Sequence, residues 1–255
     1  MKIKISLLIL TIFILLFTVS AVFALTVDEI TDKMEETSPD FTTQKTISEM
    51  ILIDKDGNEE IREMVMFSQK EENDETSSLM RFLSPKSVKG VTLLNINSGE
   101  KIYLYMPAYD KPRRIAGSSK KDEFAGTGLS YEDMNMDYED KDYEKKLLEE
   151  NDSEYKIEII PSGEDISYKK IILLVDKEKF YAKKVEFYDM SVNLSKTLEI
   201  IQIKIDENEK ITPTEIVFTD IEKNKKTKIV IKEMEYDVEL SSDFFSIRTL
   251  SKPTL

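Results

Sequence analysis

Carboxylates, amines and phenols are the side chains of this sequence that could do chemistry, because its 255 residues include no His and no Cys. Without Cys there is no disulfide, thiol nucleophile or thiolate metal site, and without His there is no imidazole base or metal ligand. Acidic residues number 50 against 36 basic ones. The resulting net charge of −14 argues against nucleic acid as a partner, since binding a polyanion relies on Lys and Arg.

Two acidic runs, residues 71–75 and 137–150, could offer oxygen ligands to calcium. Neither contains the twelve-residue loop with its Gly and terminal Glu, so we interpret both runs as solvated surface and expect no metal or cofactor. A carboxylate-based hydrolase would need two acids that converge in one cleft, and this class of function has the weakest support. We therefore predict that the chain is not an enzyme.

The first 24 residues have the pattern of a secretory signal peptide. Lys2 and Lys4 precede an apolar run at 5–19, and small or modest residues end it at Val22-Phe23-Ala24. An uncleaved membrane anchor is the alternative, although this run is shorter than the ~20 residues that span a bilayer. No Cys follows the run, so the chain cannot be acylated as a bacterial lipoprotein. We predict an exported, periplasmic and soluble chain, with residues 25–255 forming one domain.

One helix followed by many strands is the predicted order of elements. Thr26 and Glu29 form a capping-box pair, apolar residues follow at helical spacing, and Pro39 ends the segment. From there the apolar period changes to two, and Asp56-Gly57-Asn58 is a hairpin signal. The predicted strands are Thr43–Ile53, 59–68, 77–83, 91–96, 101–106, 155–160, 168–175, 182–188, 196–205, 214–219 and 227–236.

Alternation along these strands predicts one buried and one wet face, as in Val185 and Phe187 or in Ile201, Ile203 and Ile205. About eleven antiparallel strands should twist and curl into an open barrel or split into two layers. Only the N-terminal helix and residues 107–137 are left to cover the apolar concave face, and they look too small to fill it. We therefore expect a vacant cavity for an apolar ligand. The charged stretch 132–146 is interpreted as a solvated connection.

Several short motifs in the middle of the chain occur in a characteristic order. They read MRFLSP at 80–85, VKGVTLL at 88–94, YLYMP at 103–107, RRI at 113–115 and FAGTGLSYEDM at 124–134. VDKE at 175–178, KVEFYD at 184–189 and FSIRTL at 245–250 follow. This ordered set resembles the outer-membrane lipoprotein-sorting protein family, relatives of the LolA and LolB carriers, from about residue 41 to 250. Ile102 stands where the family often has Trp, and the turn at 190–193 lacks the family's usual Gly.

The resemblance implies an open, mainly β half-barrel of about eleven strands, lidded by helices, whose cavity holds acyl chains of a lipoprotein or lipid. It implies a monomeric carrier between an inner-membrane transporter and an outer-membrane acceptor. The alternatives are an accessory protein of a transporter of the resistance-nodulation-division type, and a structural envelope protein without cargo. Transfer of acyl chains from water gains ~0.8 kcal/mol per CH₂, so a carrier must open and close to release cargo.

On this reading the sequence contains two sets of site residues. The expected ligand-binding lining is Met50, Leu52, Met64, Met66, Met80, Phe82, Leu93, Leu104, Met106, Phe187 and Ile203. The expected lid or gate is Arg81, Tyr103, Tyr105, Arg113, Arg114, Phe124 and Tyr131. Structural roles remain open for both sets. The Met residues are suited to plain core, the Arg residues to surface ion pairs and the strand Tyr residues to cross-strand packing, while Ser130 and Asp133 could cap a short helix.

Overall fold

The computed structural model describes residues 24–71, 75–135, 143–162 and 166–255, which form one helix, thirteen strands and three short 3-10 helices. The predicted signal segment falls almost entirely outside the described residues. The helix is α2 (Val27–Thr37). The strands are β1 (Thr43–Ile53), β2 (Glu59–Lys70), β3 (Thr76–Ser84), β4 (Thr92–Ile96), β5 (Lys101–Tyr105), β6 (Arg113–Ile115), β7 (Glu144–Glu150), β8 (Glu154–Ile160), β9 (Tyr168–Asp176), β10 (Ala182–Asp189), β11 (Leu194–Ile205), β12 (Ile211–Asp220) and β13 (Lys225–Tyr236).

Helix α2 begins as the sequence predicts. The Thr26 hydroxyl accepts the backbone N–H of Glu29 at 3.2 Å, and the Glu29 carboxylate accepts the backbone N–H of Thr26 at 2.7 Å. This reciprocal pair satisfies two donors at the helix start that have no partner within the helix. Ile30 and Met34, one turn apart, are the buried side chains of the helix and turn its apolar face toward the sheet.

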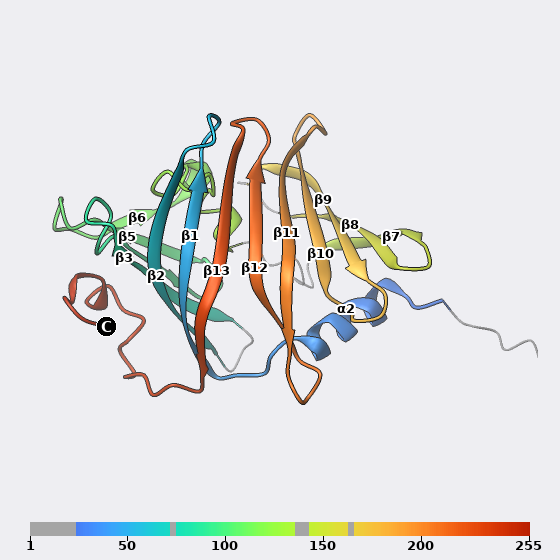
Figure 1. Cartoon of the computed structure of the whole chain (residues 1–255), viewed down its shortest axis with the longest axis horizontal. Coiled ribbons are helices and arrows are strands. Elements are labelled where there is room, and N and C mark those ends of the chain that lie inside the picture. Colours follow the sequence, from blue (N-terminus) through green and yellow to red (C-terminus); the bar gives the residue numbers. More distant parts are fainter. Residues whose placement is uncertain (1–23, 72–74, 136–142, 163–165) are drawn as a thin grey trace, which may run out of the picture.

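All thirteen strands belong to one antiparallel sheet, and each predicted strand is present. The order is β6-β5-β4-β3-β2-β1-β13-β12-β11-β10-β9-β8-β7, so β1 pairs with β13 in the middle of the sheet. Figure 1 shows the sheet curled, with its two ends turned to the same side. The edge strands β6 and β7 do not pair with each other in the described residues, so the sheet is an open half-barrel as expected.

Two strands were not predicted, and one of them corrects an interpretation. Residues 144–150, whose first part lay in the stretch interpreted as a solvated connection, form the edge strand β7, in which Leu147 pairs with Ile157. Its exposed positions are mostly charged, as is usual for an edge strand. These charged residues masked the apolar–polar alternation that would have predicted a strand from the sequence. The other addition, β6, has three residues and pairs with β5. Elsewhere in the stretch, a 3-10 helix forms at Asp133–Asn135, and residues 136–142 lie outside the described residues.

Three groups of buried apolar side chains surround the sheet. The helix cluster joins α2 to β8–β10 and to Phe218 of β12, and includes Ile30, Ile157 and Phe187. The mid-chain cluster joins β1–β5 to residues 115–131, and includes Met50, Phe82 and Phe124. Leu52 pairs with Thr227, which in turn pairs with Phe218, so both clusters lie on one face, called here the inner face.

The third group, the back cluster, lies on the opposite face of β2–β5. Its strand residues, including Val65 and Leu79, alternate with those of the mid-chain cluster. The C-terminal residues 240–250 cover it, with the Phe244 ring 4.9 Å from that of Phe67. The end of the chain therefore shields an apolar surface that the strands alone would expose to water.

The expected alternation fails in β11. The pairing with β12 shifts at Ile200–Gln202 and again at Gln202–Ile203. Ile201 is 50% exposed and Ile205 is 45% exposed, while Ile203 is half-buried outside the three clusters. Each extra residue at a bulge moves the following side chains to the other face, so the three Ile residues do not form the buried row that the sequence predicts.

Candidate functional site

The inner face between β1 and β5 collects most of the predicted lining. These side chains alternate along their strands, and the register brings neighbouring strands' apolar positions together. The buried members of the mid-chain cluster from the predicted set are Met50, Leu52, Met64, Met80, Phe82, Leu93 and Leu104, and Met66 and Met106 pack against them. Phe187 lies in the helix cluster instead. The surface is rich in Met, whose unbranched side chain adapts to neighbours of different shape.

One segment, residues 113–135, covers this surface and is called here the cover segment. Its Phe124 is fully buried and stacks on Phe82, with ring centroids 5.7 Å apart and planes 10° apart. Tyr131 meets the edge of Phe124 at 5.7 Å, and Met134 packs against both inner-face clusters. The apolar space that was expected to be vacant is therefore filled by the protein's own Phe124 and Tyr131.

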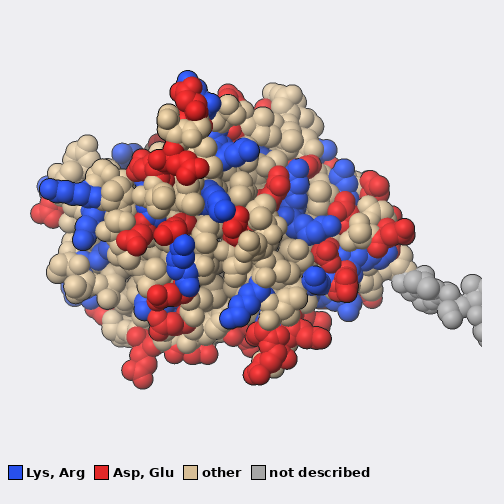
Figure 2. Space-filling model, in the orientation of Figure 1, with Lys and Arg blue, Asp and Glu red and all other residues tan. Residues whose placement is uncertain are grey.

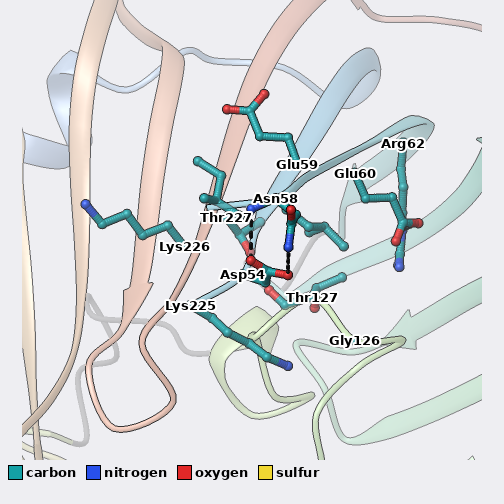
Figure 3. Close-up of a pocket in the computed structure, with 12 residues that line it drawn as sticks. Asp54, Asn58, Glu59, Glu60, Arg62, Gly126, Thr127, Lys225, Lys226 and Thr227 are labelled. Atoms are coloured by element: carbon teal, nitrogen blue, oxygen red, sulfur yellow. Dashed lines mark hydrogen bonds and ion pairs between the residues drawn. The ribbon is translucent and has the colours of Figure 1, made fainter. Parts of the chain in front are cut away.

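Two cavities border the cover segment. One of about 430 Å³ lies between its residues 122–131 and the strands, with Val88, Val91, Leu104 and Met106 as apolar lining. The other, of about 400 Å³, lies beside Gly126 and Thr127, and most of the residues that line it are polar or charged (Figure 3). Both volumes fall in the range of ~300–1,000 Å³ that is usual for small-molecule sites. Leu104 and Leu52, which line one cavity each, both belong to the mid-chain cluster.

Polar contacts hold the tip of the cover segment against β2 and β13. The Glu123 carboxylate lies 2.9 Å from the Lys225 ammonium and 3.2 Å from that of Lys223. Burial raises the pKa of Glu123, but hydrogen bonds from Lys225, the Gly128 backbone and Lys223 outweigh it and lower the pKa to about 2. The Thr227 hydroxyl donates to the carbonyl of Thr127. These contacts fix the loop that carries Phe124.

A second anchor lies at the other end of the cover segment. Ser130 and Asp133 form the predicted capping box, with 2.7 and 3.1 Å between the partner atoms. The buried Asp133 carboxylate also contacts the Lys196 ammonium at 2.6 Å and accepts the Tyr168 hydroxyl. The hydrogen bond from Tyr168 joins the cover segment to β9 and the ion pair with Lys196 joins it to β11. The segment is therefore fastened to both halves of the sheet.

Three of the predicted gate residues lie on the other side of the sheet. Tyr103 and Tyr105 belong to the back cluster, and the Tyr105 hydroxyl donates to Asp110 at 3.2 Å. Arg81 is 6% exposed, and its guanidinium donates to the carbonyls of Thr249, Leu250 and Lys252 at 2.7–3.1 Å. It makes no ion pair among the described residues, so the surface ion-pair interpretation of Arg81 is wrong. Burial lowers its pKa.

The other two predicted arginines are exposed, and Arg113 lines the 430 Å³ cavity. Sequence reasoning missed the residues that fasten the cover segment, namely Arg62, Glu123, Lys196, Lys225 and Thr227. A signal for Arg62 was available. Arg62, Met64 and Met66 are two positions apart in β2 and therefore share one face of the strand. That face is apolar, and a charged side chain on it needs a specific partner.

None of the described helices is long and apolar enough to cross a membrane. Among the described residues, no group of three or more acidic side chains is placed to hold a metal ion. The two acidic runs at 71–75 and 137–150, which we interpret as solvated surface, lie partly outside the described residues.

Three solved structures have the same fold as this chain. An outer membrane lipoprotein-sorting protein domain from Vibrio parahaemolyticus is 25% identical with a TM-score of 0.81, covering 88% of this chain and 97% of its own. A DUF1329 family protein from Desulfovibrio piger is 23% identical with a TM-score of 0.78, covering 87% and 96%. A LolA superfamily protein from Nitrosomonas europaea is 22% identical with a TM-score of 0.70, covering 88% and 98%.

The open curled sheet with its covered inner face therefore defines a LolA-like, lipoprotein-sorting fold, as the motifs predict. No curated protein matches the chain significantly. A family model described as "-like: Uncharacterized protein" matches residues 74–252, which is more than half of the chain, and the chain belongs to that family.

Proposed function

We propose that this protein is an exported, non-enzymatic carrier that holds acyl chains of a lipoprotein or lipid on its inner face during transfer through the periplasm. Residues 1–24 would act as the signal peptide and residues 25–255 as a single carrier domain. The LolA-like fold supports the general class of carrier. The specific observation behind the proposal is an apolar, Met-rich surface that a single, polar-fastened segment covers.

The mid-chain cluster suggests how cargo would enter. Phe124 now occupies the centre of the apolar surface, and the 430 Å³ cavity beside it is lined by Leu104 and Met106. An acyl chain that enters this cavity would displace Phe124 and take over its contacts with Phe82. Burying the chain would offset the cost of breaking the polar contacts of the cover segment, since each buried CH₂ contributes ~0.8 kcal/mol.

Native mass spectrometry of protein purified from the membranes of its own host tests the proposal directly. We expect co-purified lipid or lipopeptide, and uptake of a fluorescent fatty acid by the delipidated protein. Phe124→Ala should change fatty-acid affinity at least severalfold, because the ring and the acyl chain occupy the same space. Phe244→Ala, which removes the same side chain from the back cluster, is the matched control and should leave affinity unchanged. Empty protein that takes up no fatty acid would refute the carrier function.

A further inference from the structure

The 400 Å³ cavity is not used by the acyl chain in this proposal, and its lining is chemically different. It lies between the β1–β2 hairpin, the start of β13 and the loop at Gly126-Thr127 (Figure 3). Three cationic and three anionic side chains line it together with Leu52 and Ile53. Whether the cavity suits an anion or a cation depends on which of these charged groups still have free hydrogen-bonding capacity.

Arg62 has unused donors. Its side chain is 7% exposed, its Nε donates to Glu60 at 2.8 Å, and its Nη1 donates to the carbonyl of Ala125 at 2.6 Å. Nη2 makes no hydrogen bond to any described residue. Gly126 leaves space beside Nη2, since a Cβ at this glycine would lie 3.9 Å from it. The edge of the guanidinium that carries Nη2 therefore faces the cavity with its donors open.

The carboxylates of the cavity are already engaged or turned away. Asp54 accepts the backbone N–H groups of Asp56 and Asn58 and the side-chain amide of Asn58, all at 2.8–2.9 Å. Glu60 accepts from Arg62, and Figure 3 shows the Glu59 carboxylate pointing away from Gly126 and Arg62. The groups with open capacity are consequently donors, so the cavity favours a ligand that brings acceptor oxygens.

The position of Arg62 links this cavity to the acyl site. The centre of its guanidinium lies 5.3 Å from the ring centroid of Phe82, which is the partner of Phe124 in the mid-chain cluster. An anion bound to Nη2 would therefore lie at the border of the apolar surface. A carboxylate and a phosphate both match the planar donor edge of Arg.

We infer that the 400 Å³ cavity is the subsite for an anionic head group, carboxylate or phosphate, of an amphiphile whose acyl chain lies in the mid-chain cluster. This inference rests on the proposed carrier function and narrows its cargo to anionic amphiphiles. Arg62 is the residue that recognises the head group, and Gly126 keeps the approach to it open.

Matched pairs of ligands test the subsite in wild-type protein. Laurate is compared with dodecanol, and lauroyl lysophosphatidic acid with monolaurin, each by displacement of a fluorescent monoacylglycerol at neutral pH. Because laurate is better solvated by water than dodecanol, an apolar site alone would bind the acid more weakly. We expect the charged member of at least one pair to bind about tenfold tighter, as suits a charge-assisted hydrogen bond. The pair with the larger difference identifies the head group.

The variants assign the effect to Arg62. Arg62→Gln should abolish the preference for the charged ligand while the neutral ligand still binds, and Arg62→Lys should retain part of it. Arg248→Gln, at an exposed arginine of the C-terminal segment that lines neither cavity, is the control and should keep the full preference. Equal binding within both pairs by wild-type protein overturns the subsite but leaves the carrier function standing. Failure of all four ligands to displace the probe overturns the carrier function itself.

Discussion

At the scale of single residues, alternation along a strand decides what a side chain does. Leu104 and Tyr105 are neighbours in β5, yet Leu104 belongs to the mid-chain cluster and Tyr105 to the back cluster. The same rule separates Phe82 from Arg81 in β3. A residue type that looks suitable for a gate is therefore placed at the site only if its position in the strand faces the cover segment.

Leu104 provides the test at this scale. It is 7% exposed and lines the 430 Å³ cavity, so Leu104→Asp would place an unpaired charge in an apolar surface. We expect loss of fatty-acid uptake and a decrease of about 4 kcal/mol or more in the free energy of unfolding, measured by urea denaturation. Leu104→Met preserves volume and should retain uptake.

Ile203→Asp is the contrasting change, because the sequence analysis placed Ile203 in the same expected ligand-binding lining as Leu104. Because Ile203 is half-buried outside the clusters, we now expect it to cost less than about 1 kcal/mol and to leave uptake intact. A Leu104→Asp protein that folds and takes up fatty acid normally would show that the chain binds elsewhere.

At the scale of elements, the cover segment combines an apolar plug with polar fastenings. Phe124 packs into the mid-chain cluster, while Glu123 and Asp133 are held by lysines of the β12–β13 hairpin and of β11. Charge pairs are weakened by salt and by protonation, whereas burial of Phe124 is not. The two kinds of contact can therefore be separated by experiment.

The pH dependence of Glu123 separates them. Its pKa is about 2 in the folded protein against an ordinary 4.5, so its stabilising contribution is complete above pH 4.5 and is lost as pH falls toward 2. We expect the difference in free energy of unfolding between wild type and Glu123→Gln to shrink over this range, measured by urea denaturation at successive pH values. Glu59→Gln, which removes a carboxylate without an ion pair among the described residues, should show no such trend. A difference that is constant with pH would rule out the ion pairs as the fastening.

At the scale of the whole molecule, an open sheet must protect its two edges. The edge strand β6 has only three residues, and β7 has five charged residues among its seven. Short and charged edges discourage pairing with a second copy, and a net charge of −14 adds repulsion between molecules. Acidic and basic side chains are both spread over the face seen in Figure 2, with acidic ones gathered along its lower rim.

These features predict a monomer. Sedimentation equilibrium should give the mass of one mature chain at physiological salt, with no dependence on protein concentration. At high salt, where repulsion is screened, the result should be the same if the edges themselves prevent pairing. The most sensitive variant changes the edge strand β7, in which Leu148 is already an exposed apolar residue. Replacing the nearby lysines, by Lys145→Ile together with Lys146→Ile, would create an apolar edge and should promote association. A wild-type dimer would contradict the prediction.

Local pattern was enough to predict the helix and eleven strands, because capping and apolar periodicity act between residues close together in the chain. Strand β7 and the register shifts within β11 escaped prediction, since charge at an edge and an extra residue both hide a period of two. The motifs also pointed to the correct fold. The lid or gate role of Phe124 and Tyr131, which are both buried in the mid-chain cluster, stays a prediction.

What only the tertiary structure decided is which distant segments meet. The pairing of β1 with β13, the contact of Arg62 with Ala125 and that of Asp133 with Lys196 join residues 63 or more positions apart. Such contacts depend on the closing of long loops and on the three-dimensional curl of the sheet, which no local pattern encodes. For the same reason, the sequence predicted an empty apolar hollow, and only the folded chain placed its own Phe124 there.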